Sequence, residues 1–292
     1  MDDIDLAAWV GEEPEAQRKT LRMAIHLVLR AIARSDQLAP VMIMKGGILL
    51  AIRYRTGRFT TDVDFSTPRR LSDVEVPALL QQMRECLAPV SAENEYELAI
   101  ALQTHALKPP SRPGVTFPTL QMKIGYARKR EANQMARLRQ RAAARTVQID
   151  YSFNEWASEV ETMSLDGGLL AVYPLADLVA EKLRSVLQQP TRQRARFQDI
   201  YDLHLLLVVH PFSAEDRAAI LRKLRESAVG RLSAVTRDAM RDPEVIRWSR
   251  QDYNVALAPL IASAPPEFEV AYGTVSAFYA SLPWDTDWSE RQ

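Results

Sequence analysis

The stretch that decides the fold of this chain is Met42–Ser66, MIMKGGILLAIRYRTGRFTTDVDFS. A short apolar strand, Val41–Met44, leads into Lys45, Gly46 and Gly47. Glycine has no Cβ, so the backbone can approach a ligand closely at this point. If the glycines open a helix, its free N–H groups favour a phosphate. The pattern therefore predicts a phosphate site, although two glycines also make ordinary turns.

Two acidic residues lie near the end of this stretch. Asp62 and Asp64 alternate within a strand-like run, Asp62–Ser66, so both side chains leave the strand by the same face. Their mutual repulsion is relieved by Mg²⁺, which takes oxygen ligands and bridges substrate phosphates. Together with the glycines, and with Arg58 and Thr60 just ahead, this DxD predicts a site for a nucleoside triphosphate and one or two Mg²⁺ ions. The alternative is a pair of acids on a strand that faces water.

The composition is that of an ordinary globular protein. The chain has 292 residues, of which 47% are hydrophobic and 25% charged, and its formal net charge is zero. Its single cysteine, Cys86, excludes an intrachain disulfide framework and fits a reducing cytoplasm. The acidic start, MDDIDLAAWVGEEPE, does not have the pattern of a signal peptide. The sequence contains no run of about 18 apolar residues of the kind that crosses a membrane. We therefore expect a cytoplasmic protein with no membrane contact.

Hydrophobic periodicity predicts an α+β fold with two domains, residues 1–172 and 173–292. The first would hold the predicted strands together with helices, and the second would be helical. Strands are expected at Val41–Met44, Asp62–Ser66, Tyr96–Leu107, Thr119–Ala127, Thr146–Phe153 and Leu169–Val172. Helices are expected at residues 14–35, 72–87, 175–187 and within 213–282. Ser72 and Glu75 have the spacing of a capping box, so helix 72–87 is expected to begin there.

Seven basic residues crowd the segment Arg128–Arg145, and Glu131 is the only acid among them. In a chain without net charge, this concentration suggests a surface for the phosphate backbone of a nucleic acid, because binding there releases counterions. The residues expected to contact RNA are Arg128, Lys129, Arg130, Arg137, Arg139 and Arg141. The alternative is a solvated helix face or hairpin connection.

Lys182 falls on or beside the buried face of the predicted helix 175–187. A buried ammonium is costly unless an anion pairs with it, and that anion is either a buried aspartate or a bound triphosphate. Asp199 and Asp202 are three residues apart on the next helix and are therefore neighbours. Two adjacent acids need cations nearby, and Lys182 and Arg196 are the candidates.

Two segments of the decisive stretch, KGG at 45–47 and RFTTDVDF at 58–65, resemble motif one of the AbiEii/AbiGii family of nucleotidyltransferase-fold toxins. That motif has GG or GS on a loop, followed by R-x-[ST]-x-D-x-D. The resemblance covers about residues 41–209 and implies a nucleotidyltransferase-like core, a mixed β-sheet flanked by helices.

The family's downstream motif is similar to EKL at 181–183 followed by RFQDIYDL at 196–203. Lys182 falls on the motif lysine, which contacts nucleotide phosphates in the family. Asp199 falls on the essential acid, which assists in positioning the metal or the substrate hydroxyl. Gln198 departs from the pattern, because the family commonly has arginine before that acid.

The resemblance implies a Mg²⁺-dependent toxin that transfers a nucleoside monophosphate from an NTP to an acceptor such as the 3′ end of tRNA, and that has a neighbouring antitoxin. Asp150, between two apolar residues on a predicted strand, would be a third metal-binding carboxylate, unless it lies in water at a strand edge. The predicted catalytic residues are Asp62, Asp64, Lys182 and Asp199, and the metal ligands are Asp62, Asp64 and Asp150. The predicted nucleotide ligands are Lys45, Gly46, Gly47, Arg58, Thr60 and Lys182.

Two other functions are compatible with these motifs. The enzyme could transfer the nucleotide to a protein or to a small molecule such as an antibiotic. The chain could also be a non-catalytic nucleotide-binding module that acts through its helical C-terminal region, although the intact Asp62, Asp64 and Lys182 argue against this.

Overall fold

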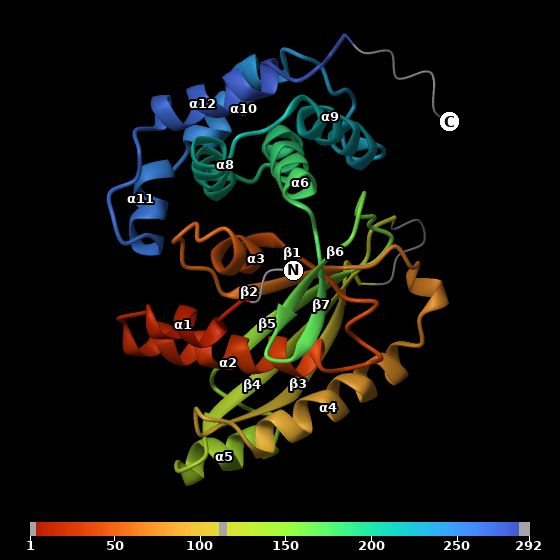
Figure 1. Cartoon of the computed structure of the whole chain (residues 1–292), viewed down its shortest axis with the longest axis vertical. Helices are drawn as coiled ribbons and strands as arrows, with labels where there is room; N and C mark the ends of the chain where they lie inside the picture. Colours follow the sequence, from red (N-terminus) through yellow and green to blue (C-terminus); the bar gives the residue numbers. More distant parts are fainter. Residues whose placement is uncertain (1–3, 111–115, 286–292) are drawn as a thin grey trace. The chain divides into compact units, whose positions relative to one another are not determined.

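The computed structural model describes residues 4–110 and 116–285, and the chain divides into two compact units (Figure 1). The sheet unit comprises residues 1–55 and 60–173, and the helical unit comprises residues 56–59 and 174–292. The short segment Thr56–Phe59 thus belongs to the helical unit, although its sequence neighbours on both sides belong to the sheet unit.

The centre of the sheet unit is a mixed β-sheet. Its strands are β1 (Ile43–Lys45), β2 (Asp62–Ser66), β3 (Leu98–Lys108), β4 (Thr119–Arg128), β5 (Thr146–Ser152), β6 (Glu161–Leu165) and β7 (Gly168–Val172). Their order is β3-β4-β5-β2-β1-β7-β6. β2 pairs antiparallel with β1 and parallel with β5, and β1 pairs parallel with β7. This sheet with its helices confirms the predicted α+β class.

The two-residue period of β2 separates its side chains into two sets. Val63 and Phe65 are completely buried in the core, whereas Asp62 is exposed and Asp64 is half-buried on the other face. The predicted strand Asp62–Ser66 therefore has the predicted limits, and its apolar residues anchor the strand while its acids stay accessible.

The helices of the sheet unit are α1 (Leu6–Gly11), α2 (Ala16–Ala33), α3 (Gly46–Arg53), α4 (Val76–Ala92) and α5 (Ala132–Arg139). α2 and α4 pack against each other and against β3 (Figure 1). α3 packs against β1 and β2. α3 begins at Gly46, so the two glycines do open a helix, which was the condition for a phosphate site here.

One expectation for this unit was wrong, and one strand was missed. α4 begins at Val76 with Glu75 as its N-cap, while Ser72 lies in a separate 3₁₀ turn and donates through Oγ to Asp73 Oδ1 at 2.9 Å. The proline after Val76 favours a helix start there, since the first turn needs no N–H donor from it. Strand β6 was not predicted.

The helical unit follows β7 and contains α6 (Leu175–Leu187), α7 (Gln189–Arg192), α8 (Phe197–Val209), α9 (Ala214–Ala228), α10 (Pro243–Arg250), α11 (Tyr253–Leu257) and α12 (Phe268–Ala280). α6 packs against α8 and α9, and α12 packs against α8. Short 3₁₀ turns lie at Leu71–Asp73 in the sheet unit and at Ala239–Arg241 and Ala258–Leu260 in the helical unit. Within residues 4–110 and 116–285, no helix is long and apolar enough to cross a membrane.

Candidate active-site residues in the two units

The acids of β2 lie beside a third carboxylate in the sheet unit. Parallel pairing of β2 with β5 sets Asp64 opposite Asp150. The Asp150 carboxylate accepts hydrogen bonds from Gln121 Nε2 at 3.0 Å and Gln148 Nε2 at 3.3 Å. β5 is an internal strand of the sheet, so Asp150 does not lie at a strand edge. The sheet thus aligns the three predicted metal ligands on neighbouring strands.

Gly46 and Asp64 come into direct contact. Lys45 pairs with Asp64 in the β1–β2 register, which brings the following glycine against the acid. Gly46 has φ +74°, and a Cβ added there would lie 2.1 Å from Asp64 Oδ2. Only glycine combines this left-handed backbone with such a close approach. The start of α3, with its amide N–H groups, is therefore held next to a DxD carboxylate.

Lys45, the N-cap of α3, is buried and forms an ion pair with Glu155. Its ammonium also lies 5.5 Å from the ring centroid of Tyr173. The Tyr173 hydroxyl accepts a hydrogen bond from Ser66 Oγ at 2.8 Å. Sequence reasoning missed Glu155, because a loop residue 110 positions away from its partner leaves no local pattern.

The helical unit contains a buried cluster of four charged side chains. Lys182 Nζ donates to Asp199 Oδ1 at 2.7 Å and to Asp202 Oδ2 at 2.8 Å. Arg58 donates through Nε and Nη2 to the two oxygens of Asp202, both at 2.9 Å. Of the two kinds of anion predicted for Lys182, the structure shows the buried aspartate, and the second cation beside the acids is Arg58 instead of Arg196.

The charges in this cluster stabilise one another. Burial acts to lower the pKa of Lys182, but the charges of Asp199 and Asp202 outweigh it and hold that pKa above its usual value. Burial alone would raise the pKa of Asp202, yet Lys182 and Arg58 bring it down to about 2. Lys182 is therefore a cation, and it cannot serve as a base near neutral pH.

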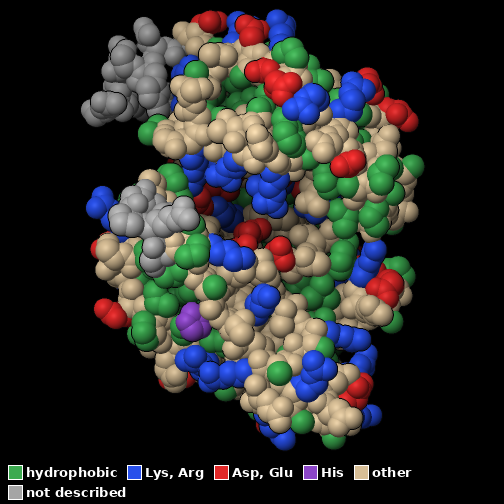
Figure 2. Space-filling view, turned by 180° about the vertical axis from the view of Figure 1, so that it is seen from behind, with side chains coloured by type: hydrophobic (Ala, Val, Ile, Leu, Met, Phe, Trp, Pro, Cys, Tyr) green, Lys and Arg blue, Asp and Glu red, His purple; other side chains and the backbone are tan. Residues whose placement is uncertain are grey.

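The predicted RNA contacts lie on and around α5. Leu138 of this helix is buried against Ala99 and Ala127 of the sheet, and this packing turns the basic side chains outward. Five of the six predicted residues are exposed. The sixth, Lys129, is half-buried, and its ammonium donates a hydrogen bond to the carbonyl of Ala92 at 2.7 Å. Figure 2 shows Lys and Arg side chains spread over the lower end of the view, where α5 lies in Figure 1.

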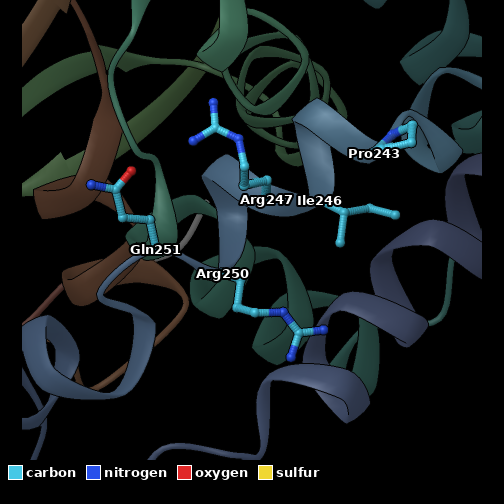
Figure 3. Close-up of a pocket in the computed structure, with 5 residues that line it drawn as sticks. All are labelled: Pro243, Ile246, Arg247, Arg250 and Gln251. Atoms are coloured by element: carbon cyan, nitrogen blue, oxygen red, sulfur yellow. The ribbon is translucent and has the colours of Figure 1, made fainter.

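The helical unit also has a surface pocket that does not include the charged cluster. It is lined by Pro243, Ile246, Arg247, Arg250 and Gln251 of α10 and its C-terminal end (Figure 3). Its arginines extend in different directions and are already paired, Arg247 with Glu244 and Arg250 with Glu269. None of the predicted site residues lines it, so it does not define the candidate site.

Residues 27–281 match the protein family described as nucleotidyl transferase AbiEii toxin, type IV TA system. The chain belongs to this family. The match covers most of the sequence and makes the protein a nucleotidyltransferase toxin of a toxin–antitoxin system, which implies a companion antitoxin. None of the curated proteins matches the chain in sequence.

Solved structures share this fold at low sequence identity. MenT4, a nucleotidyltransferase toxin from Mycobacterium tuberculosis H37Rv, is 16% identical with a TM-score of 0.60, over 97% of this chain and 89% of MenT4. JHP933 from Helicobacter pylori is 15% identical with a TM-score of 0.53, over 92% of this chain and 94% of JHP933. These similarities establish a nucleotidyltransferase-like fold for this AbiEii family member.

The residues that could hold a metal ion in this AbiEii family member are strand carboxylates. In the part of the chain that the structure describes, no group of three or more His, Cys, Asp and Glu side chains is arranged to hold a metal by itself. Asp62 and Asp64 supply hard oxygen donors of the kind that Mg²⁺ prefers, and Mg²⁺ usually completes its coordination with water and substrate phosphates. The donor set therefore fits a metal that arrives with a nucleotide.

Proposed function

We propose that this AbiEii family member transfers a nucleoside monophosphate from a Mg²⁺-bound NTP to an RNA acceptor, the 3′ end of a tRNA. The observation that carries the proposal is the contact of Gly46 with Asp64. It joins the start of a helix, which suits a phosphate, to a carboxylate, which suits a hard cation. A metal-bound triphosphate presents both partners.

In the sheet unit, Asp62 and Asp64 would hold a Mg²⁺ ion that arrives with the nucleotide, and Asp150, which lies opposite Asp64 in the strand register, would join them as a third ligand once the ion is bound. Bound Mg²⁺ supplies neutralisation of the triphosphate charge and, where two ions bind, activation of the attacking oxygen. The N–H groups of Gly46 and Gly47 donate to phosphate oxygens, and Lys45 and Thr60 add donors to the same group.

In the helical unit, Lys182 and Asp199 act on the reacting groups. Two of the three N–H donors of Lys182 go to Asp199 and Asp202, and the third donates to a phosphate oxygen. Its positive charge then stabilises the negative charge that develops on the phosphates. Asp199 retains a partly exposed carboxylate, which orients the acceptor hydroxyl and accepts its proton.

The reaction is a displacement at phosphorus. The acceptor hydroxyl oxygen forms a bond to the α-phosphorus of the NTP while the bond between this phosphorus and the bridging oxygen of the β-phosphate breaks. The nucleoside monophosphate remains on the acceptor and pyrophosphate leaves. The hydroxyl proton goes to the Asp199 carboxylate, which releases it to water.

The exposed basic residues around α5 support an RNA acceptor. Arg128, Arg130, Arg137, Arg139 and Arg141 are exposed, and Lys129 lies beside them. Contacts of this kind bind the phosphate backbone of any sequence and weaken as salt increases. Replacing Arg137, Arg139 and Arg141 by glutamine should therefore raise KM for the acceptor and reduce the salt dependence of binding, while KM for the nucleotide stays unchanged.

The deciding experiment incubates the purified protein with total tRNA, Mg²⁺ and each α-labelled NTP in turn. We expect label on RNA from the wild type and none from Asp64→Asn, with Asp36→Asn as a control because Asp36 is an exposed acid away from β2. Label on a protein or on a small molecule in place of RNA would reject the tRNA acceptor but keep nucleotidyl transfer. No label on any acceptor, together with no binding of Mg²⁺-nucleotide by calorimetry, would reject the proposed reaction.

A further inference from the structure

Asp202 is the centre of the charged cluster in the helical unit. Its side chain is 1% exposed and both oxygens are engaged, Oδ1 by Arg58 Nε and Oδ2 by Arg58 Nη2 and Lys182 Nζ. This is the two-pronged geometry that guanidinium groups form with carboxylates. A carboxylate so enclosed has no surface left to offer a substrate.

The two acids of α8 differ in this respect. Asp199 has a side-chain exposure of 13% and accepts a bond from Lys182 at one oxygen, Oδ1. Asp202, three residues further along the same helix, is enclosed. The partly exposed Asp199 can touch a substrate and the enclosed Asp202 cannot, so the same helix face carries two different roles.

We propose that Arg58 and Asp202 are positioning residues for Lys182 and Asp199. Arg58 fixes the Asp202 carboxylate, and Asp202 fixes the Lys182 ammonium beside Asp199. Arg58 thus serves the nucleotide through Lys182 instead of contacting it. The inference rests on the proposed function of Lys182 and Asp199.

The backbone around Arg58 supports this role. Arg58 belongs to the segment Thr56–Phe59, which is part of the helical unit. The next residue of the segment, Phe59, donates its N–H to the carbonyl of Leu260 at 2.7 Å. A backbone hydrogen bond and a two-pronged ion pair therefore hold the Arg58 guanidinium in one place, as a positioning residue requires.

The electrostatic consequences of removing each partner have opposite signs. Asp202 raises the pKa of Lys182, whereas the positive charge of Arg58 lowers it. Loss of the Asp202 charge should therefore move the pKa of Lys182 down, and loss of the Arg58 charge should move it up. A residue that only supported the fold would not produce this pair of opposite shifts.

The test compares Asp202→Asn, Arg58→Met and Arg58→Lys with wild type by transfer kinetics and by NMR titration of ¹³Cε-labelled lysine. The signal of Lys182 is identified by its absence in Lys182→Arg. Asp202→Asn should lower kcat by about a hundredfold, the loss that a small misplacement of a catalytic group can cause, with a much smaller change in KM. Arg58→Lys keeps the charge without the two-pronged geometry and should recover part of the kcat that Arg58→Met loses.

A matched control is available in the same unit. Asp177 is a completely buried carboxylate of α6 whose Oδ2 lies 3.5 Å from Lys223 Nζ. Asp177→Asn should destabilise the protein in a comparable way but leave the Lys182 titration unshifted. If Arg58→Met or Asp202→Asn does not fold, Arg58→Met combined with Asp202→Leu replaces the ion pair by apolar groups, which folds more readily than a broken pair.

The inference is overturned if Asp202→Asn and Arg58→Met shift the pKa of Lys182 in the same direction or not at all. It is also overturned if folded Asp202→Asn keeps the wild-type kcat, or if Lys182→Met retains transfer that Asp202→Asn loses. A wild type that transfers no nucleotide would reject the proposed function instead, and the titration would still decide whether Arg58 and Asp202 control Lys182.

Discussion

The sheet unit and the helical unit hold their predicted functional carboxylates in contrasting ways. Asp62 and Asp64 leave a short strand on its accessible face, and the core holds that strand through Val63 and Phe65. The acids of α8 lie in a buried cluster with Lys182 and Arg58. The difference suggests that the first set can be changed with little effect on the fold, whereas the second supports both fold and function.

The largest expected effect is on transfer by the strand acids. Asp64→Asn keeps the size of the side chain but removes the charge that a metal ion needs, so transfer should fall by about a thousandfold or more, as for removal of a main electrostatic contact. The melting temperature should stay close to wild type, because Asp64 is only half-buried. Transfer assays and thermal melts of the same preparation test this. A large drop in melting temperature would remove the contrast between the two units.

Gly46→Ala should come next, because it combines strain with a clash. The new Cβ would meet Asp64 Oδ2 at 2.1 Å on a backbone with φ +74°, and such strain costs about 1–3 kcal/mol. Gly167→Ala is the matched control, since Gly167 has φ +79° and nothing within 4 Å of an added Cβ. Both variants should lose stability, but only Gly46→Ala should also weaken binding of Mg²⁺-nucleotide, measured by calorimetry. Equal binding losses in the two variants would show that the Asp64 contact is unimportant.

These differences explain what the sequence could predict. Motif one could be predicted from the sequence because its signals are local. The two-residue period predicted the limits of β2, and the glycines lie at the start of α3. The pairings of Lys45 with Glu155 and of Arg58 with Asp202 could not be predicted from the sequence, since they join residues more than a hundred positions apart. Burial on α6 did predict that Lys182 needs an anion, and only the structure identifies which one.

The missed strand β6 had a signal that could have been used. Asp166 and Gly167 follow it, both with positive φ, in the Asp-Gly pair that favours a two-residue hairpin turn. α4 was misplaced for the opposite reason, because the spacing of Ser72 and Glu75 fits a capping box whereas the proline after Val76 fixes the actual start. At α4, sequence reasoning failed because two local signals for the helix start competed.

The next prediction concerns the stability that the protein loses in acid when Asp202 of the buried cluster is protonated. The folded pKa of Asp202 is about 2, below its usual 3.8, so its stabilisation is complete above pH 3.8 and is lost as pH falls toward 2. That loss amounts to about 2 kcal/mol, from 1.36 kcal/mol per pKa unit. Urea unfolding at pH 5 and at pH 2.5 should show this component in wild type and not in Asp202→Asn. If both proteins lose the same stability over this range, the cluster does not control acid unfolding.

The smallest expected effect lies in a second buried network, in the sheet unit. His26 is completely buried, with Nε2 2.5 Å from Asp166 Oδ2 and Nδ1 2.6 Å from the hydroxyl of Tyr96. Burial lowers the pKa of His26 below its usual 6.5, even though Asp166 acts to raise it. The unfolded chain therefore takes up a proton before the folded protein does, and stability should fall as pH drops below 6.5.

His26→Gln tests this, because glutamine can keep a hydrogen bond but cannot titrate. Between pH 7.5 and pH 5.5, the free energy of unfolding should fall more for wild type than for the variant. This difference should be much smaller than the loss expected from Asp202. The network of His26 would then respond to pH near neutrality, while the cluster of Lys182 would remain charged throughout this range. A wild type as insensitive as His26→Gln would mean that Asp166 compensates fully for the burial of the imidazole, so that the pKa of His26 is the same in the folded and the unfolded chain.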